Sequence, residues 1–196
     1  MKLFVKAACV AFVLTVVFSM LPFRAACADI PDKVFRLHII AASDSPDDQE
    51  LKLRVRDRVL EYTRELYSRA ASVEEAEQLT KARLQEIADT AAAEVAARGY
   101  SYPVKAEVCR MFFTTRHYDD YTLPAGDYDA LRITIGAGRG HNWWCVMFPS
   151  LCVGAQPDKR AREVFSDSEY RVVREEKREY KFYLVELFQK IRRSFS

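Results

Sequence analysis

The stretch VFRLHIIAASDSPDDQELKLRVRDRVLEYTREL, residues 34–66, contains the change of period that decides the fold. Its first part alternates: Phe35, Leu37 and Ile39 lie on one side, and Arg36 and His38 on the other. Alternation of this kind predicts a strand that is buried on one face. Further on, the apolar residues recur at helical spacing, which predicts an amphipathic helix; they are Leu51, Val55, Val59, Tyr62 and Leu66.

An acidic turn, residues 43–48, joins the predicted strand to the predicted helix. Its carboxylates suggest a metal site, but a calcium loop needs alternating carboxylates, a glycine and a distal glutamate, which this spacing lacks. Ser45 suits the N-cap of the helix, and Pro46 suits its first position. Asp47 and Asp48 then complement the positive end of the helix. We expect a helix start here and no bound metal.

A second predicted helix follows Ser72, with Glu75 completing a capping box. Its apolar stripe is Leu84, Ile87, Ala91 and Val95, and Gly99 ends it. From residue 102 the period changes to two, which predicts strands around 104–108, in a second stretch that runs through residue 113, and around 131–135 and 143–148. A last predicted helix spans about 180–193. The order strand, helix, helix, strands, helix predicts an α+β fold with helices on one face of a largely antiparallel sheet.

The first 28 residues have the pattern of a targeting segment. Lys2 and Lys6 precede an uncharged run, residues 7–23, and Ala26 and Ala28 supply the small residues that a signal peptidase needs just before its cleavage site. We expect a signal peptide over residues 1–28; because Arg24 interrupts the pattern, an N-terminal membrane anchor through residues 7–23 is the alternative. Either way, residues 29–196 are expected to form a single α+β domain outside the cytoplasm.

The charge of the exported part excludes two classes of partner. Removal of residues 1–28 takes away Lys2, Lys6 and Arg24, which lowers the formal net charge from +2 to about −1. A nearly neutral domain gives no electrostatic reason to bind nucleic acid. Its charges are interspersed and form no polybasic block, so we expect membrane contact only through the N-terminal segment.

Three cysteines lie beyond the targeting segment: Cys109, Cys145 and Cys152. In an oxidising compartment Cys145 and Cys152 can form a disulfide across a turn at residues 149–150; the alternative is two buried thiols. No Cys-x-x-Cys motif is present, so the sequence indicates neither a thioredoxin-like site nor a zinc knuckle.

No pattern predicts a cofactor, a small-molecule substrate or a catalytic site. The glycine cluster 136–140 lies between two strands and has His141 where a dinucleotide fingerprint needs glycine. A zinc site formed by His38, His117 and His141 is not indicated, because no two of these residues have the spacing of zinc ligands.

The alternative function is an enzyme, a cell-envelope hydrolase with Cys145 as nucleophile. Its general base would be His117 or His141, and the carboxylate that orients this base would be Asp119 or Asp120. Against it, Cys145 lies in an apolar run, not at a helix start that would lower its pKa.

The segment His141-Asn142-Trp143-Trp144 is dense in aromatic residues. Adjacent strand residues point to opposite faces, so one tryptophan enters the core unless helices cover both faces. The alternation slightly favours Trp144 as the buried ring. We therefore predict a partner-binding site at His141, Asn142, Trp143 and Trp144, with Trp143 as its anchor.

A set of segments has a composition that is rare as a combination: 36–41, 43–49, 51–53, 55–57, 123–128, 130–132, 151–152 and, above all, GHNWWCVMFP at 140–149. These segments resemble the stage II sporulation protein R family over about residues 33–153, and again weakly at 180–187. Two residues depart from the family pattern: Ala42, where asparagine is usual, and Ser150, where a second proline is common.

The resemblance implies a role that the residues alone do not reveal. Family members are made in the forespore of an endospore-forming bacterium and exported to the space between forespore and mother cell. There they are thought to activate a membrane-embedded aspartic protease of the mother cell, which cleaves a sigma-factor precursor. Such a ligand needs an export signal, a folded domain and a binding surface, but no catalytic residues and no cofactor.

Overall fold

The computed structural model describes residues 2–68, 70–118, 120–149, 151, 157–174 and 179–194. Within its helices the side chains at positions 2, 3, 13, 16, 17, 157, 158, 179 and 180 are left out of the description. The chain divides into two compact units. One comprises residues 31–112 and 127–164, and the other comprises residues 1–30, 113–126 and 165–196. Each unit is described by itself.

A four-stranded sheet forms the centre of the unit made of residues 31–112 and 127–164. Its order is β2-β5-β1-β6, with β1 at Phe35–Ile40, β2 at Val104–Phe113, β5 at Gly126–Ile135 and β6 at Asn142–Phe148. Strand β1 runs parallel to β5 and antiparallel to β6. The sheet is therefore mixed, and the prediction of a largely antiparallel sheet is confirmed only in part. The parallel pair is possible because a long crossover, which includes three helices, separates β1 from β5.

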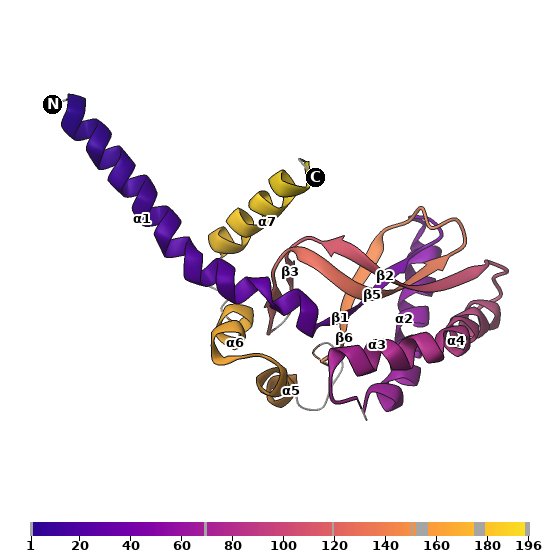
Figure 1. The fold of residues 1–196 in the computed structure, drawn as a ribbon. Helices are drawn as coiled ribbons and strands as arrows, with labels where there is room; N and C mark the ends of the chain where they lie inside the picture. Colours follow the sequence, from indigo (N-terminus) through magenta and orange to yellow (C-terminus); the bar gives the residue numbers. More distant parts are fainter. Residues whose placement is uncertain are drawn as a thin grey trace. The chain divides into compact units, whose positions relative to one another are not determined.

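Three helices of the same unit bury their apolar residues against one side of this sheet: α2 at Pro46–Tyr67, α3 at Val73–Ala82 and α4 at Leu84–Ala97 (Figure 1). Alternate residues of β1 point into this core, as the alternation predicts; they are Phe35, Leu37 and Ile39. The other face of the strand is buried as well, since Arg36 and His38 are 0% and 4% exposed, so the prediction of one buried face is wrong. The helices contribute Leu51, Val55, Val59, Ile87, Ala91 and Val95. This side of the sheet thus has the predicted α+β packing.

The predicted helix starts are present. Ser45 has extended backbone angles, and its hydroxyl accepts the Asp48 N–H at 3.2 Å, with Pro46 in the first helical position. The hydroxyl of Ser72 accepts the Glu75 N–H at 3.3 Å, while the Glu75 carboxylate reaches back to the Ala71 N–H at 2.8 Å. Both caps satisfy backbone donors that a helix start leaves unpaired.

The prediction of one continuous helix after Ser72 is wrong, because the structure has two helices there, α3 and α4. Arg83 has φ −114° and ψ 17°, which lie outside the helical range, and it ends one helix and begins the next. The stripe from Leu84 to Val95 belongs to α4 alone, whereas α3 buries Ala76 and Thr80. Continuous helical propensity across residues 73–97 concealed this bend, since propensity carries no information on packing direction.

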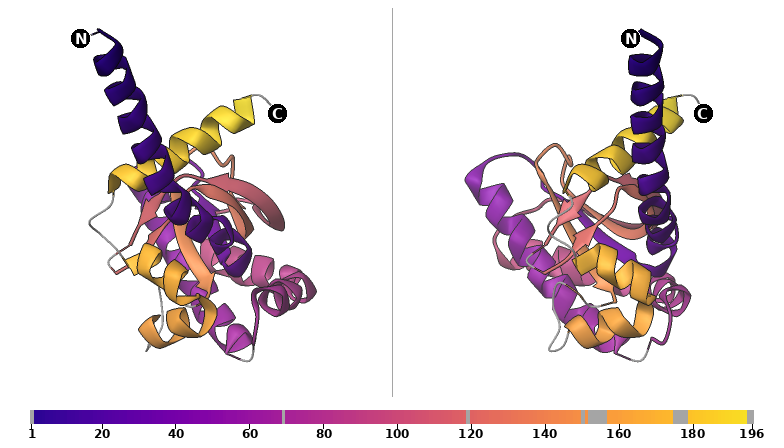
Figure 2. Two further views of the ribbon diagram at one scale, coloured as in Figure 1. Left: turned by 60° about the vertical axis from the view of Figure 1, so that its left-hand side comes forward. Right: turned by 90° about the vertical axis from the view of Figure 1, so that its left-hand side faces the viewer.

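The unit made of residues 1–30, 113–126 and 165–196 is mainly helical. It contains α1 at Lys2–Ala28, α6 at Asp167–Arg174 and α7 at Glu179–Ser194, together with a two-stranded sheet of β3, Arg116–His117, and β4, Thr122–Leu123. Figure 2 shows α1 (indigo) beside α6 (orange) and α7 (yellow) from two sides. The predicted last helix is confirmed as α7. Within the described residues, no helix is both long enough and apolar enough to cross a membrane.

Two short helices were not predicted: α5 at Pro157–Val164, in the sheet-containing unit, and α6. Each has eight residues. Both are short and rich in charged residues; in α6 the buried residues Glu169, Val172 and Val173 lie at helical spacing, but only two of them are apolar.

Candidate functional site

Two loops meet at one end of the sheet, where β1 ends and β6 begins. Residue Ile40 pairs with Asn142, and His38 pairs with Trp144. Beyond the strands, the Gly140 N–H donates to the Ala41 carbonyl oxygen at 3.0 Å. A Cβ added to Gly140 would lie 2.1 Å from the Ser43 carbonyl oxygen, so the loops approach as closely as they do only because residue 140 is glycine.

Two contacts of one carboxylate oxygen join the exposed tips of these loops. The Asp44 carboxylate accepts the backbone N–H of His141 at 2.6 Å, and the same oxygen contacts Nδ1 of the His141 ring. The Asp44 and His141 side chains are 55% and 79% exposed, so a partner can reach both. Hydrogen bonds from the His141 backbone and ring hold the pKa of the Asp44 carboxyl below its usual value. Asp44 is therefore charged at neutral pH and fixes the orientation of His141.

Side chains of helix α2 form hydrogen bonds with the backbone of the same loops. Lys52 is 5% exposed, and its ammonium donates to the His141 carbonyl oxygen at 3.1 Å and to Gln49 Oε1 at 2.6 Å. The Gln49 amide donates in turn to the Ser43 carbonyl oxygen at 2.9 Å. Burial lowers the pKa of Lys52, against the opposing effect of the Asp44 charge. A buried polar group is costly unless it is hydrogen-bonded, so these contacts favour one loop conformation.

Trp144 stacks on His38 across the β1–β6 pair. The ring centroids are 3.9 Å apart and the planes differ by 5°. His38 Nε2 lies 2.9 Å from Oδ1 of Asn142, which fixes the imidazole from a second direction. His38 is 4% exposed, whereas Trp144 is only partly buried. Trp144 is thus partly accessible while one of its faces lies on His38.

Trp143 points to the other face, as the strand period requires. It packs against the core that α2 covers, and the Arg56 guanidinium lies 4.4 Å from its ring centroid. The indole N–H is buried and has no hydrogen-bond partner among the described residues. Both tryptophans are partly buried, but Trp143 is the one in contact with the hydrophobic core. The expectation that Trp144 is the residue in the core is therefore wrong, whereas the binding role predicted for Trp143 stays a prediction.

The structure brings together three of the four predicted binding residues, His141, Asn142 and Trp144, and adds Asp44. We call these four residues the loop surface. The sequence interpretation missed the role of Asp44 because it assigned the acidic turn only to a helix start. It also missed His38, Lys52 and Arg56, which support the site; their signal was their position in segments that resemble the family.

The residues considered for other chemistry are placed differently. Cys145 is 2% exposed within the hydrophobic core, so a substrate does not reach its sulfur in this conformation. His117 lies in the other unit, with Nδ1 3.0 Å from the Thr122 hydroxyl, and Asp120 pairs there with Arg174. Cys152 and Asp119 lie outside the described residues, as does the proposed disulfide that involves Cys152. Among described residues no cluster of three or more His, Cys, Asp or Glu side chains can hold a metal ion.

The fold and the loop surface together define an α+β protein with an exposed polar and aromatic site at one end of its sheet. Residues 31–157 match the stage II sporulation protein R family. Stage II sporulation protein R of Bacillus subtilis (strain 168) is 35% identical over 180 residues, which cover 80% of each chain. No solved structure matches the chain. The chain belongs to the stage II sporulation protein R family and is a sporulation protein.

Proposed function

We propose that this protein is an exported signal of endospore formation. It is made in the forespore, reaches the space between the forespore and mother-cell membranes, and activates a membrane-embedded aspartic protease of the mother cell. The protease then processes a sigma-factor precursor. Membership of the family supports this proposal, and so does an N-terminal segment with the pattern of an export signal.

One observation favours a binding role for a particular surface. Two of the segments that carry the resemblance, residues 43–49 and 140–149, are far apart in sequence, yet they meet through Asp44 and His141. Exposed charged and aromatic groups on a rigid base are typical of a partner-binding site. The receptor contact is accordingly assigned to the loop surface, with Trp144 in place of Trp143 as its aromatic member.

In this proposal residues 1–28 direct export, and a peptidase cleaves after Ala28. N-terminal sequencing of the exported protein is then expected to start at Asp29 or close to it. If uncleaved chain is recovered in the membrane fraction, residues 7–23 are a membrane anchor and not part of a cleaved signal peptide. Recovery of full-length chain in the cytosol would contradict export.

The receptor assignment is tested by His141→Ala, with Asp89→Ala as the matched control. Asp89 is exposed on α4 and, like His141, belongs to the unit that contains the sheet. The variants are produced in forespores that lack the unaltered protein, and both their abundance and the processing of the sigma-factor precursor are measured. We expect H141A to accumulate normally and to lose most processing, while D89A keeps it. Normal processing with H141A would contradict the assignment.

The alternative function, a hydrolase that uses Cys145, gains no support from the structure because that thiol is enclosed in the core. Its test is Cys145→Ser, which would abolish hydrolysis but is expected to preserve signalling if the domain still folds.

A further inference from the structure

The four-stranded sheet has a second face, opposite the hydrophobic core, and the two ends of this face differ in exposure. Alternate residues of β1, β5 and β6 point to it, and they are not members of the core. One end is closed, since Arg36, Ala130 and Val146 are 0–2% exposed. At the end that adjoins the loop surface, Ile40 and Thr134 are in register and both remain partly exposed. This end of the second face is therefore open to a partner.

A row of side chains crosses all four strands at the open end. Trp144 of β6 stacks on His38 of β1, and His38 is in register with Arg132 of β5. The Nε of Arg132 donates to Oε1 of Glu107 on β2 at 2.7 Å, and Nζ of Lys105 lies 3.1 Å from Oε2 of the same carboxylate. We call these five residues the sheet row. Because Trp144 also belongs to the loop surface, the sheet row continues that surface across the sheet.

The sheet row carries more positive than negative charge. Arg132 and Lys105 share the single carboxylate of Glu107, and among the described residues neither cation forms an ion pair with a second carboxylate. Hydrogen bonds from Arg132 and Lys105 hold the pKa of the Glu107 carboxyl below its usual value, so this group is charged at neutral pH. The Lys105 side chain is 70% exposed. One positive charge is thus left for a carboxylate that a partner supplies.

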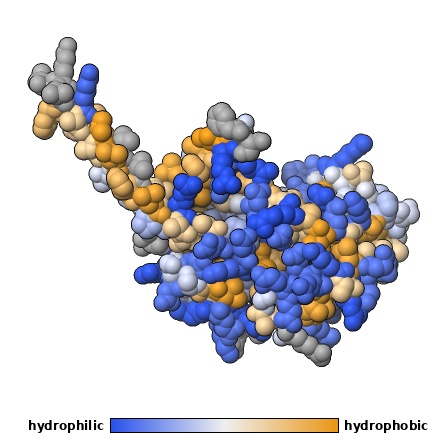
Figure 3. Space-filling model, viewed as in Figure 1, coloured by the Kyte–Doolittle hydropathy of each residue, from blue (hydrophilic) through white to orange (hydrophobic). Residues whose placement is uncertain are grey.

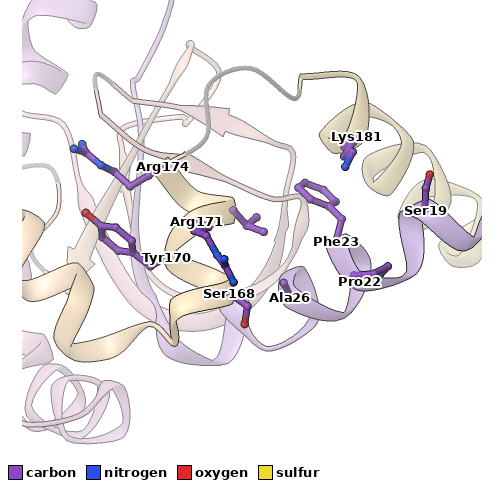
Figure 4. Close-up of a pocket in the computed structure, with 10 residues that line it drawn as sticks. Ser19, Pro22, Phe23, Ala26, Ser168, Tyr170, Arg171, Arg174 and Lys181 are labelled. Carbon is purple, nitrogen blue, oxygen red and sulfur yellow. The ribbon is translucent and has the colours of Figure 1, made fainter. Parts of the chain in front are cut away.

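The helical unit offers a pocket as an alternative place for a partner. Its volume is about 520 Å³, and α1 contributes Ser19, Pro22, Phe23 and Ala26 to its lining (Figure 4). Cleavage after Ala28 would remove all four of these residues. In Figure 3 hydrophobic residues follow α1, whereas hydrophilic residues predominate on the rest of the visible surface. Polar and charged groups are accordingly the better candidates for recognition of the exported form.

We propose that the receptor contact extends from the loop surface over the sheet row, and that the receptor segment bound there carries a carboxylate that pairs with Lys105 and Arg132. This inference rests on the proposed function and adds to it the chemistry of the partner. The acidic segment lies beside Trp144, which offers it an aromatic surface. A charge pair at the edge of an interface acts mainly on the rate of association and weakens as salt is added.

The test compares the charge reversal Lys105→Glu with Lys81→Glu as a matched control. Lys81 of α3 pairs with Glu77, and the two side chains are 59% and 24% exposed, close to the 70% and 28% of Lys105 and Glu107. Each change therefore replaces one surface ion pair with a repulsion. The variants are made in the full-length chain, so any processing of residues 1–28 is the same in all of them. Their association with the purified protease in lipid nanodiscs is measured at several salt concentrations.

At low ionic strength we expect K105E to associate at least about threefold more slowly than the unaltered chain, while K81E keeps the unaltered rate. Added salt should slow the unaltered chain and K81E, and should narrow their difference from K105E. Lys105→Gln removes the charge without adding a repulsion and should show a smaller slowing in the same direction. Melting curves of all variants verify that the domain is folded.

Equal association rates for K105E and K81E, in an experiment where His141→Ala binds weakly, would overturn this inference and leave the proposed function in place. Faster association of K105E would also overturn it, because the receptor segment would then be basic. If the unaltered chain sediments as a dimer and K105E as a monomer, a second copy of the chain covers the sheet row, which again overturns it. Failure of the unaltered chain to bind the protease would contradict the proposed function itself, and this inference with it.

Discussion

The carboxylate of Asp44 accepts the backbone N–H of His141, a residue 97 positions further along the chain, at 2.6 Å. This hydrogen bond connects the loop after β1 to the loop before β6. It brings the acidic turn and the tryptophan segment into contact, although the sequence interpretation treated them separately.

The Asp44–His141 contact predicts a dependence of stability on pH. The folded state holds the pKa of Asp44 below its usual value, so the contact stabilises the protein fully above the unfolded pKa and is lost as the pH falls through the folded pKa. Thermal unfolding of the unaltered chain and of Asp44→Asn should be compared from neutral pH into the acid range. We expect a lower Tm for D44N at neutral pH and convergence of the two values in acid. A constant difference would contradict this explanation.

Ser45→Ala should cost about 1 kcal/mol in the free energy of unfolding, because the Asp48 N–H loses its cap. Ser101→Ala, at an exposed position outside any helix, is the control and should be neutral. Chemical denaturation measures both values. Metal analysis of the two variants should show no change, since the acidic turn is assigned to the cap; loss of a stoichiometric metal from Asp47→Ala/Asp48→Ala would reverse that assignment.

Gly140→Ala should separate the two loops, because its Cβ would overlap the Ser43 carbonyl oxygen. We expect a cost of about 1–3 kcal/mol and loss of signalling. Gly99→Ala is the informative control: its φ is +83°, but nothing lies within 4 Å of an added Cβ. It should strain the end of α4 and leave signalling intact at equal protein abundance. Equal signalling by the two variants would show that close contact of the loops is not required.

The two tryptophans should separate stability from signalling. Trp143→Ala removes a ring that packs against the core and under Arg56, and should cost about 3 kcal/mol, the lower end of the range for core tryptophans because the ring is only partly buried. Trp144→Ala loses the stack on His38 and should cost about 1 kcal/mol. Signalling should fail in W144A although the domain folds. Melting curves that rank the two variants in the reverse order would contradict this assignment.

Local patterns predicted the local structure well. The alternation of Phe35, Leu37 and Ile39, and the caps at Ser45 and Ser72, depend on neighbours within a few residues, and all are present. Sheet direction was predicted less well, because the parallel pairing of β1 with β5 joins residues about a hundred positions apart. No short-range period encodes that choice.

The site was predictable only in part, because its local features follow from strand alternation whereas its contacts join residues that are far apart in sequence. Trp143 and Trp144 had to lie on opposite faces, but the alternation could not show which face α2 covers. His38 and Lys52 are buried polar residues, and their partners, Trp144 and the His141 carbonyl oxygen, are far from them in the sequence. Such pairs become visible only when the chain is folded.

The central claim, that the loop surface contacts the protease, is tested most directly by site-specific photo-crosslinking in sporulating cells. A crosslinking residue replaces Arg139, an exposed position beside the loop surface, and Asp89 is the control position. We predict a covalent product between the chain and the membrane-embedded protease from position 139 and none from position 89. A product from position 89 alone, in cells that process the sigma-factor precursor normally with both variants, would contradict the account.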